Sequence, residues 1–183
     1  MNHLGKFGAV CLTGIVVGLT GQNDAGVYRA HADIQGSPGS GVSGEAIFVQ
    51  EESGILPTVL VKVEIRGLVA GSVHGVHLHE MGTCEPDFKA SGGHFDPGPY
   101  GMSNPDANHP FHMGDLPNLV ADENGVAVLE YRTSRVTLSP GPLSLFDEDG
   151  SAVIVHVDPD RGTTGVKGGA GGARLACGII ETK

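Results

Sequence analysis

Apolar and polar residues alternate over several short stretches of this chain. Successive side chains of a β-strand point to opposite faces, so this alternation is typical of strands. In the clearest stretch, Thr58–Ile65, branched apolar side chains occupy every second position, with Lys62 and Glu64 between them. Strands are also expected at Val27–Ile34, Val42–Gln50, Val73–His79, Val126–Tyr131, Val136–Leu138, Ala152–Val157 and Leu175–Ile180. About eight short strands without a helical period predict an all-β fold, an antiparallel sandwich or barrel.

Two long stretches lack this alternation. Glu80–Leu119 is rich in Gly, Pro, Asn and Asp, and Asp158–Ala173 is rich in Gly. Loops of such length inside a compact domain are usually functional or disordered. The first loop contains the candidate metal ligands His94, His109, His112 and Asp115. Because coordination supplies the order that packing cannot, we interpret it as a metal-binding loop.

The sequence Gly75-Val76-His77-Leu78-His79-Glu80 places two histidines on one face of an expected strand. Val76 and Leu78 share the opposite face, which suits a core. Two imidazoles side by side on a rigid strand form a chelating pair, because neutral histidine is the commonest metal ligand. A surface strand with two unrelated histidines is the alternative. His74 has the parity of the core residues, so we interpret it as structural.

Composition limits the function. The 183 residues suit one domain, and 30 glycines, 11 prolines and no tryptophan agree with many tight turns. The net charge of −10 argues against a binder of nucleic acid or of anionic membranes. An anionic substrate would therefore need a local positive patch.

The N-terminal residues 1–25 are expected to be a signal peptide or an N-terminal anchor, which leaves 26–183 as the domain. One lysine, Lys6, precedes the apolar run Phe7–Leu19. That run is shorter than the roughly 20 residues of a membrane span, so a cleaved secretory signal is favoured. An uncleaved anchor, or a lipid on Cys11, would be the only link to a membrane. The protein is thus expected to be exported, to the periplasm or the cell surface.

With Cys11 set aside, the chain has two cysteines, Cys84 and Cys177. Export compartments are oxidising, so two thiols there most simply pair. Two free buried thiols are the alternative.

Several sequence blocks, in order, resemble the copper–zinc superoxide dismutases, particularly the exported bacterial members. The blocks are Gly75–Glu80, Cys84, Gly92–Pro97, His112–Asn118, Val155–His156 and Gly172–Ile180. The resemblance implies a flattened eight-stranded Greek-key barrel, related to immunoglobulin-like sandwiches, with the site under two long loops. It implies dismutation of superoxide to dioxygen and hydrogen peroxide, and a disulfide between Cys84 and Cys177. The oligomeric state varies in the family, so a homodimer is one option.

The resemblance also implies the ligands of two metals. Copper would be held by His77, His79, His94 and His156, since four nitrogens in a flattened square suit Cu(II). Zinc would be held by His94, His112 and Asp115, and these three together with His109 offer a reasonable tetrahedral set. His94 would bridge the two metals and carry a proton during turnover.

Two further residues match positions near the family's metals. Arg174, in Arg174-Leu175-Ala176-Cys177-Gly178, would hold the incoming superoxide; a salt bridge at a strand end is the alternative. Asp160, four residues after His156, would support a copper and a zinc histidine; a plain turn residue is the alternative.

The zinc set departs from the family pattern. The second zinc histidine usually lies about eight residues after the bridging one, where this chain has Met102. His109 is the only unassigned histidine in the loop, so we predict that it completes the four ligands that a structural zinc needs. A solvent-exposed His109 is the alternative.

Two other functions are the alternatives. A noncatalytic metal-binding relative would be expected to lack copper ligands or the arginine, and this chain keeps all of them. A zinc hydrolase would need an open zinc position and a general base, which the full zinc set does not offer.

Overall fold

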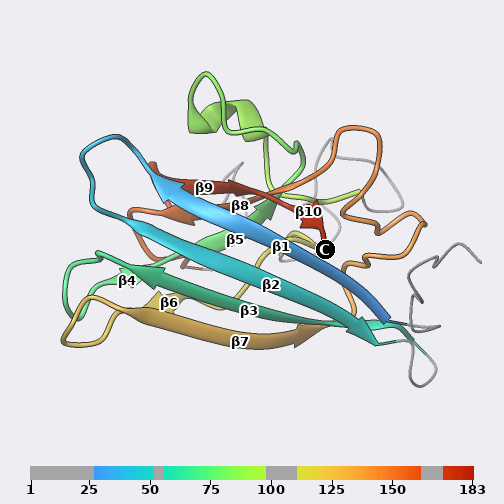
Figure 1. The fold of residues 1–183 in the computed structure, drawn as a ribbon, viewed down its shortest axis with the longest axis horizontal. Coiled ribbons are helices and arrows are strands. Elements are labelled where there is room, and N and C mark those ends of the chain that lie inside the picture. The colour runs from blue at the N-terminus through green and yellow to red at the C-terminus, as the bar shows by residue number, and fades with distance from the viewer. Residues whose placement is uncertain (1–26, 52–55, 98–110, 162–170) are drawn as a thin grey trace, which may run out of the picture.

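An antiparallel sheet that curls on itself forms the body of the protein (Figure 1). The computed structural model describes residues 27–51, 56–97, 111–161 and 171–183. The eight-stranded sheet has the order β5-β8-β9-β1-β2-β3-β7, and β10 pairs with β1. Its strands are β1 (Val27–Gly36), β2 (Ser43–Glu51), β3 (Thr58–Arg66), β5 (Val76–His79), β7 (Ala127–Thr133), β8 (Ala152–His156), β9 (Arg174–Ile179) and β10 (Glu181–Thr182). The prediction of an all-β antiparallel fold is confirmed.

The alternation predicted for the third strand is present in β3. Val59, Val61, Val63 and Ile65 are all buried, whereas Lys62 between them is exposed. β3 pairs along its length with β2 and with β7, so one face of this layer is mostly apolar, with buried Gln50 and Thr133 beside Val59 at one end. That face has to pack against a second apolar layer, since burying one such side chain contributes roughly 1.5–3 kcal/mol.

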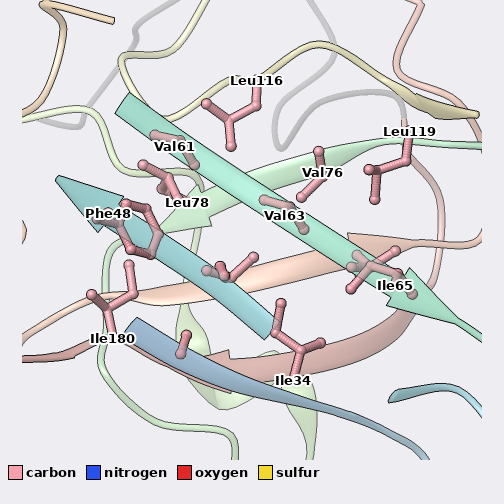
Figure 2. Packing of buried hydrophobic residues seen from close by; sticks show 14 of the residues in the cluster. Ile34, Phe48, Val61, Val63, Ile65, Val76, Leu78, Leu116, Leu119 and Ile180 are labelled. Carbon is pink, nitrogen blue, oxygen red and sulfur yellow. The ribbon is translucent and has the colours of Figure 1, made fainter. Parts of the chain in front are cut away.

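β5 belongs to the second layer, and the core lies between the two. Figure 2 shows Phe48 of β2 and Val61 and Val63 of β3 packed with Val76 and Leu78 of β5. Val76 and Leu78 are fully buried, as the parity of the strand predicts. The apolar face of β5 thus holds in place the strand that carries His77 and His79.

The strand expected at Val73–His79 is broken at Gly75 into β4 (Val73–His74) and β5. β4 pairs with β6 (Leu119–Val120), and β5 pairs with β8. Gly75 donates to the Asp158 carbonyl at 2.9 Å and accepts from His156 N at 2.8 Å. A Cβ on Gly75 would lie 3.2 Å from Asp160 N and 3.3 Å from His77 Cε1. Glycine at this position therefore lets the second long loop approach β5.

The strand expected at Val136–Leu138 does not form, and this detail of the prediction is wrong. Thr137 instead makes backbone hydrogen bonds with Leu143 and Leu145. Leu138 N donates to the side-chain oxygen of the fully buried Gln50 at 2.5 Å. The backbone of this segment is therefore satisfied without a ladder. Elsewhere, one 3₁₀ turn, η1 (Phe88–Ser91), lies in the first long loop. No helix in the described parts is long and apolar enough to span a membrane.

Candidate metal centre

β5 and β8 place three histidines close together. His77 and His79 lie on β5, and β8, its antiparallel neighbour, ends at His156. The register between β8 and β9 shifts at Val155/His156. Such an irregularity turns a side chain away from the regular pleat. The rings of His77 and His156 approach to 4.8 Å between centroids.

The free edge of β5 holds the first long loop. Leu78 N donates to the Gly114 carbonyl at 2.9 Å, and Phe95 N donates to the Leu78 carbonyl at 2.8 Å. A Cβ on Gly114 would lie 2.4 Å from Leu78 O, so only glycine permits this approach. Isolated bridges join His77 to Asp115 and His79 to His94. A loop without regular structure is therefore anchored directly beside the ligand strand.

Each of three histidines has one ring nitrogen held by a hydrogen bond. His79 Nδ1 donates to the Gly92 carbonyl at 3.1 Å, and His156 Nδ1 to the Gly172 carbonyl at 3.2 Å. His77 Nε2 donates to Asp160 Oδ2 at 2.9 Å. A donating nitrogen fixes the tautomer, so the other nitrogen of each ring keeps its lone pair.

The remaining nitrogens form one group. His77 Nδ1, His79 Nε2, His94 Nε2 and His156 Nε2 are buried, and within the described parts of the chain none of them has a hydrogen-bond partner. The four residues offer ligand atoms that all lie within 4.8 Å of one another. Buried nitrogens that are left unsatisfied cost free energy, and a metal ion would satisfy all four at once. The donor set fits copper.

A second group shares His94 with the first. His94, His112 and Asp115 offer ligand atoms within 4.8 Å of one another. His94 Nδ1 lies 2.7 Å from Asp115 Oδ1, and His112 Nδ1 lies 3.4 Å from Asp115 Oδ2. The nitrogens and the carboxylate fit zinc. His109, the predicted fourth ligand, lies outside the described residues and stays a prediction.

Asp160 lies against His77. Its hydrogen-bond partner Asn118 is a site residue that the sequence does not single out. Asn118 Nδ2 donates to the Asp160 carbonyl at 2.8 Å, and Asp160 N donates to Asn118 Oδ1 at 2.9 Å. The two long loops are thus joined where Asp160 accepts from His77. An amide in a loop gives no sequence signal for such a partner.

Burial lowers the pKa values of His79, His94 and His156 and so favours their neutral forms. Desolvation, with smaller effects of His94 and Arg174, lowers the pKa of His79 to about 2. Desolvation and the nearby His77 lower the pKa of His156 to about 4. Burial opposes ionisation of Asp115, but hydrogen bonds from His112 and His94 outweigh it and lower the pKa of this carboxyl. Neutral imidazoles and an ionised carboxylate are the forms that bind metals.

Arg174 reaches from the start of β9 to the first long loop. Its guanidinium donates to the carbonyls of Phe88 and Gly92, and to Ser91 Oγ at 3.3 Å. Its charge is among the causes that lower the pKa values of His79 and His156. Arg174 also lines a surface cavity of about 640 Å³. A half-buried cation thus stands beside the histidine group of an acidic protein.

Cys84 and Cys177 form a disulfide, as predicted. Cys84 and Phe88 of η1 both pack against the small apolar cluster that contains Cys177. The bond ties the loop that binds Arg174 to β9, the strand that carries Arg174. His74 is buried, as expected from its parity. Its Nδ1 donates to the His156 carbonyl at 2.7 Å, which agrees with a structural role.

Comparisons with known proteins agree with this geometry. Residues 42–180 match the model of the family described as copper/zinc superoxide dismutase. A Cu-Zn superoxide dismutase of Caulobacter vibrioides is 44% identical over 129 residues, which cover 67% of this chain and 71% of that protein. The Cu-Zn superoxide dismutase 1 of Aquifex aeolicus is 37% identical over 157 residues, covering 84% and 88% of the two chains.

A solved structure shares the fold. A double mutant of a superoxide dismutase-like protein from Bacillus subtilis is 33% identical, with a TM-score of 0.62, and the match covers 81% of this chain and 95% of that one. The buried histidine cluster, the family match and these relatives together show that the chain belongs to the copper/zinc superoxide dismutase family, which converts superoxide to dioxygen and hydrogen peroxide with copper and zinc as cofactors.

Proposed function

We propose that this chain dismutes superoxide at a copper held by His77 Nδ1, His79 Nε2, His94 Nε2 and His156 Nε2. The observation that supports this assignment is the convergence of four buried nitrogens that lack hydrogen-bond partners among the described residues. The second nitrogens of His77, His79 and His156 are already engaged. These hydrogen bonds hold the three rings in orientation, so that their other nitrogens face one common group.

Copper supplies one-electron redox chemistry, by which one superoxide is oxidised to dioxygen and a second, with two protons, is reduced to hydrogen peroxide. His94 differs from the other histidines because its Nδ1 faces Asp115 and its Nε2 faces the histidine group. We assign to His94 Nε2 the holding of one of the two protons that peroxide needs, which this nitrogen could take only while it is not bound to copper. His94 is thus both a ligand and a catalytic residue.

His94 Nδ1, His112 and Asp115 are the proposed zinc ligands, with His109 as the fourth. A tetrahedral structural zinc needs four protein ligands. Holding His94 Nδ1 at zinc would fix the ring and leave only Nε2 to exchange a proton. Asp160, which accepts from His77 Nε2, orients that ring. We propose that it supports the copper group without binding metal.

Arg174 is the proposed binding group for superoxide. A guanidinium is always charged and carries five N–H donors, and three acceptors of the first loop hold it in place. A fixed cation beside the histidine group attracts an anion locally, against the net charge of −10. The disulfide keeps this loop beside β9.

We further propose that residues 1–25 direct export and that 26–183 form the mature enzyme in the periplasm or at the cell surface. The disulfide supports an oxidising compartment, and a relative from Onchocerca volvulus is named an extracellular superoxide dismutase. Cell fractionation and the mass of the mature N-terminus test this. A full-length product in the cytoplasm would contradict it. Association as a homodimer is a separate proposal, tested by sedimentation.

Metal content and superoxide dismutation of the purified protein test the proposed function. We expect one copper and one zinc per chain, with copper-dependent activity that chelation removes and copper restores. A protein that takes up both metals and leaves superoxide decay at the uncatalysed rate would instead be a noncatalytic metal-binding relative.

A further inference from the structure

Arg135 lies just beyond β7, far in sequence from the metal-binding loop, yet its half-buried side chain reaches that loop. Its guanidinium donates through Nη2 to the main-chain carbonyl of Asp115. Arg135 Cζ also lies 4.9 Å from the centroid of the Phe111 ring, within cation–π distance. Thr133, at the end of β7, orients the base of the arginine, because its Oγ1 accepts from Arg135 N at 3.1 Å and from Nε at 3.4 Å.

The segment from Phe111 to Asp115 supplies two proposed zinc ligands, His112 and Asp115. His112 follows Phe111, and its backbone N donates to Asp115 Oδ2 at 2.9 Å. Asp115 N in turn donates to the His112 carbonyl at 3.2 Å. The segment is thus a closed turn with one contact to Arg135 at each end.

Two other parts of the chain contact this turn, one on each of two sides. Leu78 N of β5 donates to Gly114 O, which holds the side toward the histidine group. Arg135, which extends from the end of β7, holds Asp115 O and the Phe111 ring. β7 pairs with β3 and β5 with β8, so these supports come from separate parts of the sheet. Together they fix both the position and the rotation of the turn.

We propose that Arg135 is a positioning residue for zinc: it binds the Asp115 carbonyl and the Phe111 ring and so holds His112 and Asp115 in their ligand geometry. This inference rests on the proposed zinc assignment. A cation that acted only through its charge would repel Zn²⁺, and its removal would tighten zinc binding. A cation that positions the ligands has the opposite effect, so removing it weakens zinc binding. The sign of the change separates the two.

The test is the zinc dissociation constant of copper-free Arg135→Met, measured by competition with a chelator. Methionine keeps a long apolar stem and removes the donors and the charge. Loss of such a supporting contact typically lowers metal affinity by about 10–100-fold. Arg132→Met is the matched control, because Arg132 is an exposed arginine of β7 that contacts Glu51 at 3.4 Å. We expect it to bind zinc as the wild type does.

One further variant and a second measurement keep the outcome clear. Arg135→Lys retains a charge and one donor nitrogen but loses the planar fork of the guanidinium, so an intermediate affinity is expected. It serves as the test should Arg135→Met not fold. The absorption of Co²⁺ in place of zinc is expected to change in the Arg135 variants, because it reports ligand geometry. Zinc affinity that is unchanged or tighter in the Arg135 variants, or equally weakened in Arg132→Met, would overturn the inference, whatever happens to the melting temperature of the metal-free protein.

Asp115→Ala separates this inference from the zinc assignment. If Asp115→Ala binds zinc as tightly as the wild type, the assignment itself is wrong. If Asp115→Ala loses zinc while the Arg135 variants keep it, only the role of Arg135 is wrong.

Discussion

His94 Nδ1 lies 2.7 Å from Asp115 Oδ1, while His94 Nε2 belongs to the group of four buried nitrogens. One imidazole therefore connects two clusters of candidate metal ligands. The main chain enforces the connection, because the segments that carry His94 and Asp115 are both bridged to β5. A change at either residue is therefore expected to affect both groups.

Arg174→Ala is expected to keep both metals and lose rate. A local cation can raise the rate of encounter with an anion by about 10-fold or more, and salt screens this attraction. We therefore expect activity at low ionic strength to fall about 10-fold, with a weaker dependence on salt. Stopped-flow kinetics over a range of salt concentrations measure both. Arg66→Ala, which removes an exposed cation paired with Glu64, is the control; an equal loss there would mean that only net charge matters.

Loss of the disulfide is expected to lower stability and activity together. Cys84 and Cys177 are 93 residues apart in sequence, and closing so long a loop stabilises by roughly 4–5 kcal/mol in the chain-entropy model. The double variant Cys84→Ser/Cys177→Ser should therefore unfold at lower denaturant. It should also lose rate, because η1 would no longer be tied to β9. Full activity of the folded double variant would show that Arg174 keeps its place without the bond.

The metal-free protein should lose stability as the pH falls below about 6.5, the ordinary pKa of histidine. Burial lowers the pKa of His156 to about 4 and of His79 to about 2, so the unfolded chain binds more protons than the folded one between these values and 6.5. Each such histidine lowers the free energy of unfolding by up to about 1.4 kcal/mol per pH unit in its window. Urea unfolding at pH 7, 6 and 5 measures the slope.

In the same experiment, His79→Gln should flatten this dependence. Equal slopes in wild type and His79→Gln would contradict the assignment of the effect to this histidine.

His109 and His112 are distinguished by zinc content. If both are ligands, His109→Ala and His112→Ala should each weaken zinc binding, since a closed tetrahedral site loses a ligand in either case. Chelator competition on the two variants makes the comparison. Wild-type affinity in His109→Ala beside loss in His112→Ala would remove His109 from the ligand set.

The alternation of apolar and polar residues predicts those structural features that depend on residues close together in the sequence. The buried face of β3 and the shared face of His77 and His79 follow from a period of two. The break at Gly75 was missed, because its cause is the close approach of Asp158 and Asp160. Val136–Leu138 was mistaken for a strand because its apolar side chains do enter the core, while its backbone bonds to Gln50 and its own loop.

The residues of the candidate site likewise fall into two groups, those that sequence motifs identify and those that only the folded structure brings together. The histidines and Arg174 could be named because ordered motifs carry them. The contacts of Asn118 with Asp160 and of Arg135 with Asp115 join segments far apart in sequence. No pattern along the chain marks such pairs, so they appear only in the folded structure.

The copper assignment is tested most directly by the metal content and superoxide dismutation of His79→Ala, beside His31→Ala as the control. The account predicts that His79→Ala loses copper and activity and retains zinc, because His79 contributes only to the first group. It predicts wild-type copper, zinc and activity in His31→Ala. Wild-type copper content and activity in His79→Ala would contradict the account.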